Sequence, residues 1–175
     1  VDIPWIVSEY GYSSFAGRVE MELPAALLNA EIVAQFLQYG GTTAYYYGLE
    51  PKSPIKELNC TPKDRLWGDL AMFEADEGIV KWRLPVYHGT KMLVEEWAEP
   101  TNAPHQMFPV EVSQNGMPCA TVAAYALQRP DQKWAVLLLN KNTKTVTLNR
   151  VELDIPKNTD SLPVNESVDV VQYSS

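Results

Sequence analysis

A single carboxylate ends the first apolar segment of the chain. Glu9 follows Trp5-Ile6-Val7-Ser8 and precedes the aromatic, glycine and small polar residues of positions 10–13. A short apolar run bounded in this way is typical of a buried strand. In parallel β/α barrels the strand interiors are packed, and the reacting groups lie at the C-terminal ends of the strands. The pattern therefore predicts that Glu9 is a catalytic acid at the end of a strand.

The segment after this strand has the pattern of a helix that leads to a second strand. Positions 23–39 carry apolar residues on one face and polar residues on the other, which predicts an amphipathic helix. Pro24 suits the first turn, and Gly40-Gly41 suits a C-terminal cap. Residues 42–47 then form a tyrosine-rich second strand. Strand, helix and strand together make a crossover unit between parallel strands.

The remainder of the chain divides into a second helical region and a region of strands. Residues 52–78 read as a long loop with short helical turns, and residues 85–97 have helical spacing with Pro100 shortly after. The proline-rich and polar stretch 101–109 marks a domain crossing. We therefore expect one domain over 1–104 and a β-sandwich over 105–175. Its expected strands are 121–127, 134–139, 145–148 and 167–173.

Composition excludes several classes of function. A formal charge of −8 and a pI near 4.7 argue against a nucleic-acid surface, because phosphate binding requires clustered Lys and Arg. No apolar run is long enough to span a membrane. His88, His105, Cys60 and Cys119 lack metal-ligand spacing, so we expect neither a metal nor a cofactor. A disulfide between the two cysteines and two separate thiols both remain open.

These features together resemble a known family. The chain resembles the C-terminal half of a retaining glycoside hydrolase in five features. These are the strand end Val7-Ser8-Glu9-Tyr10-Gly11, the helix closed by Gly40-Gly41, the tyrosine-rich strand, the helix ending Glu95-Glu96-Trp97 and the strand ending Leu138-Leu139-Asn140-Lys141. The resemblance is to the large clan, clan A, built on the (β/α)₈ barrel. It covers most of the chain in element order, and the region of the seventh strand carries its specific part.

The resemblance implies a role for Glu9 and a partner outside the chain. In the clan, the carboxylate at the end of the seventh strand is the nucleophile, which corresponds to Glu9 here. A retaining enzyme also needs a protonated acid about 5–5.5 Å away. In the clan that acid lies on the fourth strand, for which this chain has no segment. The expected fold is α/β plus β: the last two strand-helix units of the barrel followed by a β-sandwich, incomplete at both ends, with the N-terminal part of the barrel missing.

The resemblance also implies a carbohydrate substrate and suggests which residues bind it. Aromatic faces suit the apolar faces of pyranose rings, and Tyr10, Tyr47 and Trp67 are the aromatic candidates. Because side chains alternate along a strand, we assign Tyr47 to the site and Tyr46 to packing. Tyr10 could also hydrogen-bond the adjacent carboxylate or a substrate hydroxyl. Glu50 is a candidate to bind a sugar hydroxyl, and its alternative is a solvated loop residue.

The sequence supports two hypotheses for the function. The first is a secreted or envelope-associated retaining glycosidase that forms a glycosyl-enzyme on Glu9, with the general acid outside this fragment. The second is a non-catalytic carbohydrate-binding or structural module on the same scaffold. A third hypothesis is a free-standing sandwich with a helical N-terminal extension, and the strand-helix-strand pattern argues against it.

Overall fold

The computed structural model describes residues 3–13, 17–57, 65–67, 70–148, 150 and 169–173. Its first unit is the expected crossover. Strand β1 (Ile6–Tyr10) is followed by the short 3₁₀ helix η1 (Gly17–Met21) and by helix α1 (Leu23–Gln38), and strand β2 (Thr43–Tyr46) then pairs with β1 in parallel. Pro24 lies in the first turn of α1, and Gly40 follows the helix with a positive φ of 86°, as a C-terminal cap requires.

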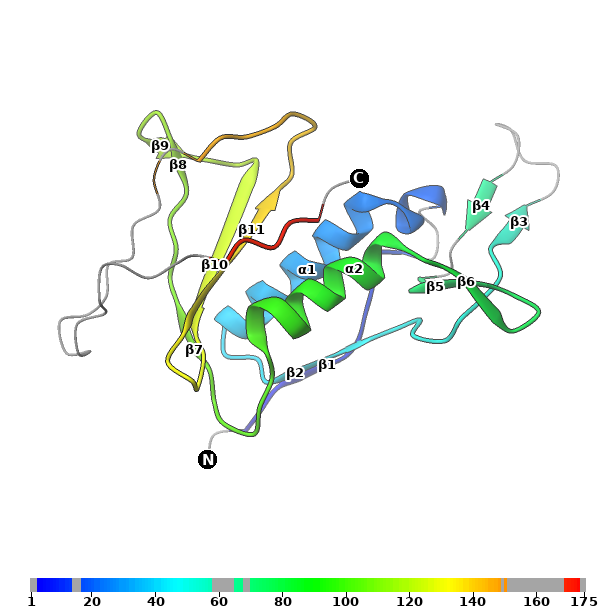
Figure 1. Ribbon diagram of the computed structural model, residues 1–175, viewed down its shortest axis with the longest axis horizontal. Helices are drawn as coiled ribbons and strands as arrows, with labels where there is room; N and C mark the ends of the chain where they lie inside the picture. The colour runs from blue at the N-terminus through cyan, green and yellow to red at the C-terminus, as the bar shows by residue number, and fades with distance from the viewer. Residues whose placement is uncertain are drawn as a thin grey trace.

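The second helical region is also present where the sequence predicts it. Helix α2 (Pro85–Lys91) continues directly into a π-helical segment, η2 (Met92–Ala98). Helix α2 packs against α1, and Figure 1 shows the two helices lying side by side. Gly89 permits this approach, because a Cβ at its position would lie 3.2 Å from the Ala26 Cβ and the Ala26 carbonyl oxygen.

The region expected to be a loop with helical turns is built of strands instead. Strands β3 (Ile55–Glu57) and β4 (Arg65–Trp67) form one antiparallel pair. Strands β5 (Phe73–Asp76) and β6 (Ile79–Arg83) form a second pair around the turn Glu77-Gly78. Glu77 and Gly78 both have positive φ, which is the conformation of a type I′ hairpin turn. The prolines of the segment indicate a loop, whereas the Glu77-Gly78 pair is the signal of this turn.

The C-terminal region forms an antiparallel sheet. Strand β10 (Val122–Gln128) pairs with β11 (Trp134–Asn140) over its whole length and with β7 (Gln106–Phe108) on its other edge. Strands β8 (Ser113–Gln114) and β9 (Met117–Pro118) make a small separate hairpin. The expected strand at 145–148 is irregular, and so is 169–173, the described part of the last expected strand.

Local side-chain bonds explain why no strand follows β11 directly. The Asn142 N–H donates to the Asn140 Oδ1 at 2.9 Å, and the Lys144 N–H donates to the Asn142 Oδ1 at 3.0 Å. The Asn140 side-chain amide in turn donates to the Lys144 carbonyl. Such bonds give the backbone partners within a turn and compete with a sheet ladder.

The main apolar core joins the helices to the antiparallel sheet. It contains buried residues of α1, η2, β10 and β11: Ala30, Ala34, Leu93, Trp97, Tyr125, Leu127, Leu137 and Leu139. A smaller cluster joins Ala25 of α1 to Met72 and Val86, with Tyr46 of β2 packed against it. The main core therefore crosses the expected boundary between residues 104 and 105. Within the described residues the parallel sheet has two strands and does not close into a barrel.

Candidate functional site

The two parallel strands have one face against the helices and one open face. Tyr46 packs against the cluster that holds Ala25 and Val86, so it lies on the helix side. Tyr10 is opposite Tyr46 in the register, and the two rings meet edge to face with centroids 5.4 Å apart. Since neighbouring residues of a strand point to opposite faces, Tyr45 belongs to the open face. Tyr45 and Tyr47 are both exposed, and Tyr47 lies in the turn directly after β2.

A register shift between the strands places Glu9. Val7 is opposite Ala44 and Tyr10 is opposite Tyr46, so β1 has two residues, Ser8 and Glu9, where β2 has only Tyr45. All three are exposed. An extra residue of this kind bends a strand and changes the direction of its side chains, and such irregularities are common next to active sites. Glu9 therefore lies near the C-terminal end of a parallel strand, beside the exposed Tyr45 of the next strand.

The other site residues proposed from the sequence have different surroundings. The Lys52 ammonium lies over the Tyr47 ring, 5.7 Å from its centroid, so one face of this ring is next to a cation. Glu50 is exposed in the loop after β2, and among the described contacts none joins it to Glu9. Trp67 ends β4, and its side chain is outside the described part of the chain, as is Cys60.

Hydrogen bonds fasten the C-terminal ends of the two strands to a distant segment. The Tyr47 N–H donates to the Tyr10 carbonyl at 2.9 Å, and the Met72 N–H donates to the Gly48 carbonyl at 3.2 Å. The Tyr46 hydroxyl donates a hydrogen bond to the Leu70 carbonyl. Burial, followed by the charges of Tyr10 and Glu20, raises the pKa of Tyr46, and burial raises the pKa of Tyr10. Both phenols therefore stay protonated at neutral pH and can act as donors.

Sequence reasoning did not identify Glu20 or Leu70 as part of this region. Glu20 is buried in η1, and its carboxylate accepts the Leu70 N–H at 3.3 Å. The two residues are 50 positions apart, and no local pattern links them. Gly48 gives the one usable signal, since a glycine directly after a strand indicates a turn or a close backbone approach.

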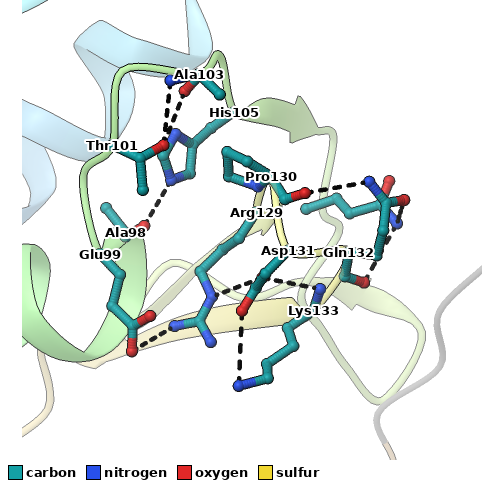
Figure 2. A network of polar contacts seen from close by, with 11 residues as sticks. Ala98, Glu99, Thr101, Ala103, His105, Arg129, Pro130, Asp131, Gln132 and Lys133 are labelled. Atoms are coloured by element: carbon teal, nitrogen blue, oxygen red, sulfur yellow. Dashed lines mark hydrogen bonds and ion pairs between the residues drawn. The ribbon is translucent and has the colours of Figure 1, made fainter.

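A second polar cluster lies at the far end of the helical region (Figure 2). The Arg129 guanidinium contacts the carboxylates of Glu99 at 3.0 Å and Asp131 at 3.5 Å. The Lys133 ammonium contacts Asp131 as well, at 3.6 Å, and His105 Nε2 lies 2.6 Å from the Ala98 carbonyl oxygen. Each charge here has a partner of opposite sign, so the cluster is explained as a connection between the end of η2 and the β10–β11 turn.

The described residues show neither a metal centre nor a membrane-crossing helix. No group of three or more His, Cys, Asp or Glu side chains in the described ranges is placed to hold a metal ion. Similarly, no helix in this part of the chain has the length and apolar character needed to cross a membrane. Cys119 is a free thiol whose Sγ lies 3.6 Å from the Thr121 hydroxyl.

Comparison with known proteins gives no family. No family model matches the chain, and no curated protein or solved structure matches it significantly.

Proposed function

We propose that this chain supplies the nucleophile strand of a retaining glycoside hydrolase, with Glu9 as the nucleophile. The observation that carries the proposal is the register shift at Ser8-Glu9, which presents an exposed carboxylate near the C-terminal end of a parallel strand. In enzymes built on parallel β/α units, this end of the strands holds the catalytic groups. The exposed Tyr45 of β2 and the exposed Tyr47 directly after it offer rings against which a sugar can stack.

The chemistry divides between this chain and polypeptide outside it. Glu9, ionised, attacks the anomeric carbon and forms a glycosyl-enzyme ester while the bond to the leaving oxygen breaks. A general acid outside these 175 residues protonates that oxygen, and afterwards, as a base, takes a proton from the water that hydrolyses the ester. The proposed substrate is an oligo- or polysaccharide, and the proposed location, which follows from the resemblance alone, is outside the cell or in its envelope.

The first test removes the nucleophile in the enzyme that contains the complete barrel. Glu9→Gln should lower kcat by roughly four to six orders of magnitude, because no covalent intermediate forms. Glu50→Gln is the control, since Glu50 is also an exposed glutamate but lies in the loop after β2, and it should keep kcat within about tenfold. Full activity of Glu9→Gln would remove Glu9 from the mechanism.

The second test identifies the role of Glu9 by its product. A Glu9→Ala enzyme leaves space for azide, and an aryl glycoside with a good leaving group needs no general acid. Azide should then restore turnover and give a glycosyl azide of inverted anomeric configuration, because the substitution occurs in one step. A glycosyl azide of retained configuration would instead indicate that Glu9 is the general acid/base.

A non-catalytic carbohydrate-binding module is the second candidate, and the exposed Tyr45 and Tyr47 favour it. For this function, Tyr47→Ala should weaken oligosaccharide binding by about 1–2 kcal/mol through the loss of a stacking ring. Tyr39→Ala is the control, because Tyr39 is also exposed but follows α1. Binding that depends on Tyr47, together with wild-type behaviour of Glu9→Gln in every assay, would favour the module over the enzyme.

A further inference from the structure

A buried carboxylate lies next to the candidate site and has no part in the proposed mechanism. Glu20 is 2% exposed, although acidic side chains are almost never fully buried without a partner. Its Oε2 accepts the Leu70 N–H at 3.3 Å. Burial of a carboxylate is costly unless hydrogen bonds compensate it, so the position of Glu20 is tied to the backbone at Leu70.

Leu70 itself has an unfavourable backbone conformation. Its φ is +59°, in the left-handed region that glycine and asparagine enter more easily than leucine. Both backbone polar groups of Leu70 are bound: the N–H donates to Glu20, and the carbonyl accepts the Tyr46 hydroxyl. Strain of this kind persists only where the surroundings hold it in place. Here the two side chains hold the residue from both of its sides.

The held residue fills the space between the ends of the two parallel strands. A Cβ at Gly11, just after β1, would lie 3.1 Å from a Leu70 methyl carbon. A Cβ at Gly48, two residues after β2, would overlap the Leu70 carbonyl oxygen. Leu70 therefore contacts the chain just beyond both Glu9 and Tyr47, and its conformation determines where these two strand ends lie relative to each other.

We propose that Glu20 is a positioning residue for the candidate site. Through its bond to the Leu70 N–H it fixes the left-handed conformation that delivers the Leu70 carbonyl to Tyr46 and the Leu70 side chain to Gly11. The ends of β1 and β2, and with them Glu9 and Tyr47, are thereby held in one relative position. The effect of Glu20 on catalysis rests on the proposed glycosidase function, whereas its effect on the strand ends does not.

The experiment compares three variants by amide hydrogen exchange and by kinetics. Glu20→Leu removes the acceptor with little change in size, and Glu20→Gln keeps an acceptor oxygen. Glu22→Gln is the control, since Glu22 is exposed and pairs with Arg18 at the surface. In Glu20→Leu the Tyr47 amide, which donates to Tyr10, should exchange about tenfold faster, the effect of one or two lost hydrogen bonds. In Glu20→Gln and Glu22→Gln the Tyr47 amide should exchange at the wild-type rate.

The kinetics of the complete enzyme provide the second measurement. Glu20→Leu should lower kcat by about 100-fold with little change in KM, because a misplacement of about 1 Å at the reacting groups has that effect. Glu20→Gln should restore most of kcat. If the wild type has no glycosidase activity, the proposed function fails, and the exchange of the Tyr47 amide still decides the role of Glu20.

A double variant covers the case in which Glu20→Leu does not fold. Glycine adopts a positive φ at no steric cost, so Leu70→Gly added to Glu20→Leu should recover the fold and part of the protection of the Tyr47 amide. Unchanged exchange in Glu20→Leu would overturn the proposal. The proposal would also fail if Glu20→Leu and Glu20→Gln reduced the protection of the Tyr47 amide equally. It would fail as well if the double variant recovered none of this protection.

Discussion

The Arg129 guanidinium lies 3.0 Å from the Glu99 carboxylate and joins the residue after η2 to the turn between β10 and β11. The Arg129 side chain is 10% exposed and that of Glu99 is 53% exposed. Glu99 has a positive φ of 44°, so the chain turns sharply as η2 ends. The pair therefore connects the helical region to the antiparallel sheet at a point where the backbone changes direction (Figure 2).

Removing this arginine should destabilise the protein more than removing its exposed neighbour. Arg129→Met should lower the free energy of unfolding by about 1–2 kcal/mol, since two ion-pair contacts of a nearly buried group are lost. Lys133→Met, which removes an exposed cation beside the same Asp131, should change it by less than about 0.5 kcal/mol. Urea denaturation of both variants measures the difference, and equal effects would contradict a connecting role for Arg129.

The main apolar core predicts that the helices and the antiparallel sheet unfold together. Leu127 of β10 is 1% exposed and belongs to the cluster that includes Ala34 of α1 and Trp97 of η2. Leu127→Ala should therefore lower the free energy of unfolding by about 2–5 kcal/mol. The helical circular dichroism signal should be lost in the same transition in which the sheet unfolds. Leu138→Ala on β11, where the side chain is 43% exposed, should have a much smaller effect.

An independent pair of domains would give a different result. If residues 1–104 and 105–175 were separate cooperative units, Leu127→Ala would shift only the transition of the second. Separate probes of helix content and tryptophan fluorescence would then give midpoints that no longer coincide.

Several elements could be predicted from the sequence because local rules govern them. The spacing of apolar residues, with Pro24 at one end and Gly40 at the other, predicted α1 to within a residue at its end. The helical spacing of residues 85–97 likewise predicted the α2–η2 region. Strands β10 and β11 were also expected within about two residues of their ends.

Features that depend on distant contacts were outside the reach of such rules. The register shift at Ser8-Glu9 exists only when β1 is paired with β2, and the Glu20–Leu70 bond spans 50 residues. The core that joins α1 to β10 also crosses a stretch of prolines and polar residues. Composition there indicated a domain boundary, but it carries no information on which surfaces pack across it.

Gly48 should be one of the least replaceable residues near the candidate site. Its φ is +99°, and an added Cβ would overlap the Leu70 carbonyl oxygen. Gly48→Ala should therefore lower the free energy of unfolding by about 2–5 kcal/mol, the sum of backbone strain and overpacking. Gly40→Ala is the matched control: its φ is +86° and the space around it is open, so only the strain of about 1–2 kcal/mol applies.

Thermal or urea denaturation separates the two contributions. A Gly48→Ala variant as stable as Gly40→Ala would show that the close approach of Leu70 to the end of β2 is not maintained in solution. That outcome would also remove the structural basis for a positioning role of Glu20.

Ionisation of Tyr46 should lower the free energy of unfolding at alkaline pH. Burial, with the charges of Tyr10 and Glu20, raises its pKa above the ordinary value of 10.0, so the folded state holds its proton more strongly than the unfolded state. The resulting stabilisation is fully present below about pH 10 and is lost as pH rises above it toward the folded-state pKa. Tyr46→Phe should be about 1 kcal/mol less stable at pH 7, since the Leu70 carbonyl loses its donor.

The same variant should lose less stability than the wild type between pH 10 and the highest pH at which the protein stays folded, because one phenol no longer ionises. Tyr10 keeps part of this dependence, since burial raises its pKa as well. Denaturation midpoints measured from pH 7 to about pH 11 test the expectation, and Tyr39→Phe, which changes an exposed side chain, serves as the control. Parallel curves for the wild type and Tyr46→Phe across this range would show that the hydroxyl of Tyr46 is accessible to water and does not hold the Leu70 carbonyl at the ends of the two strands.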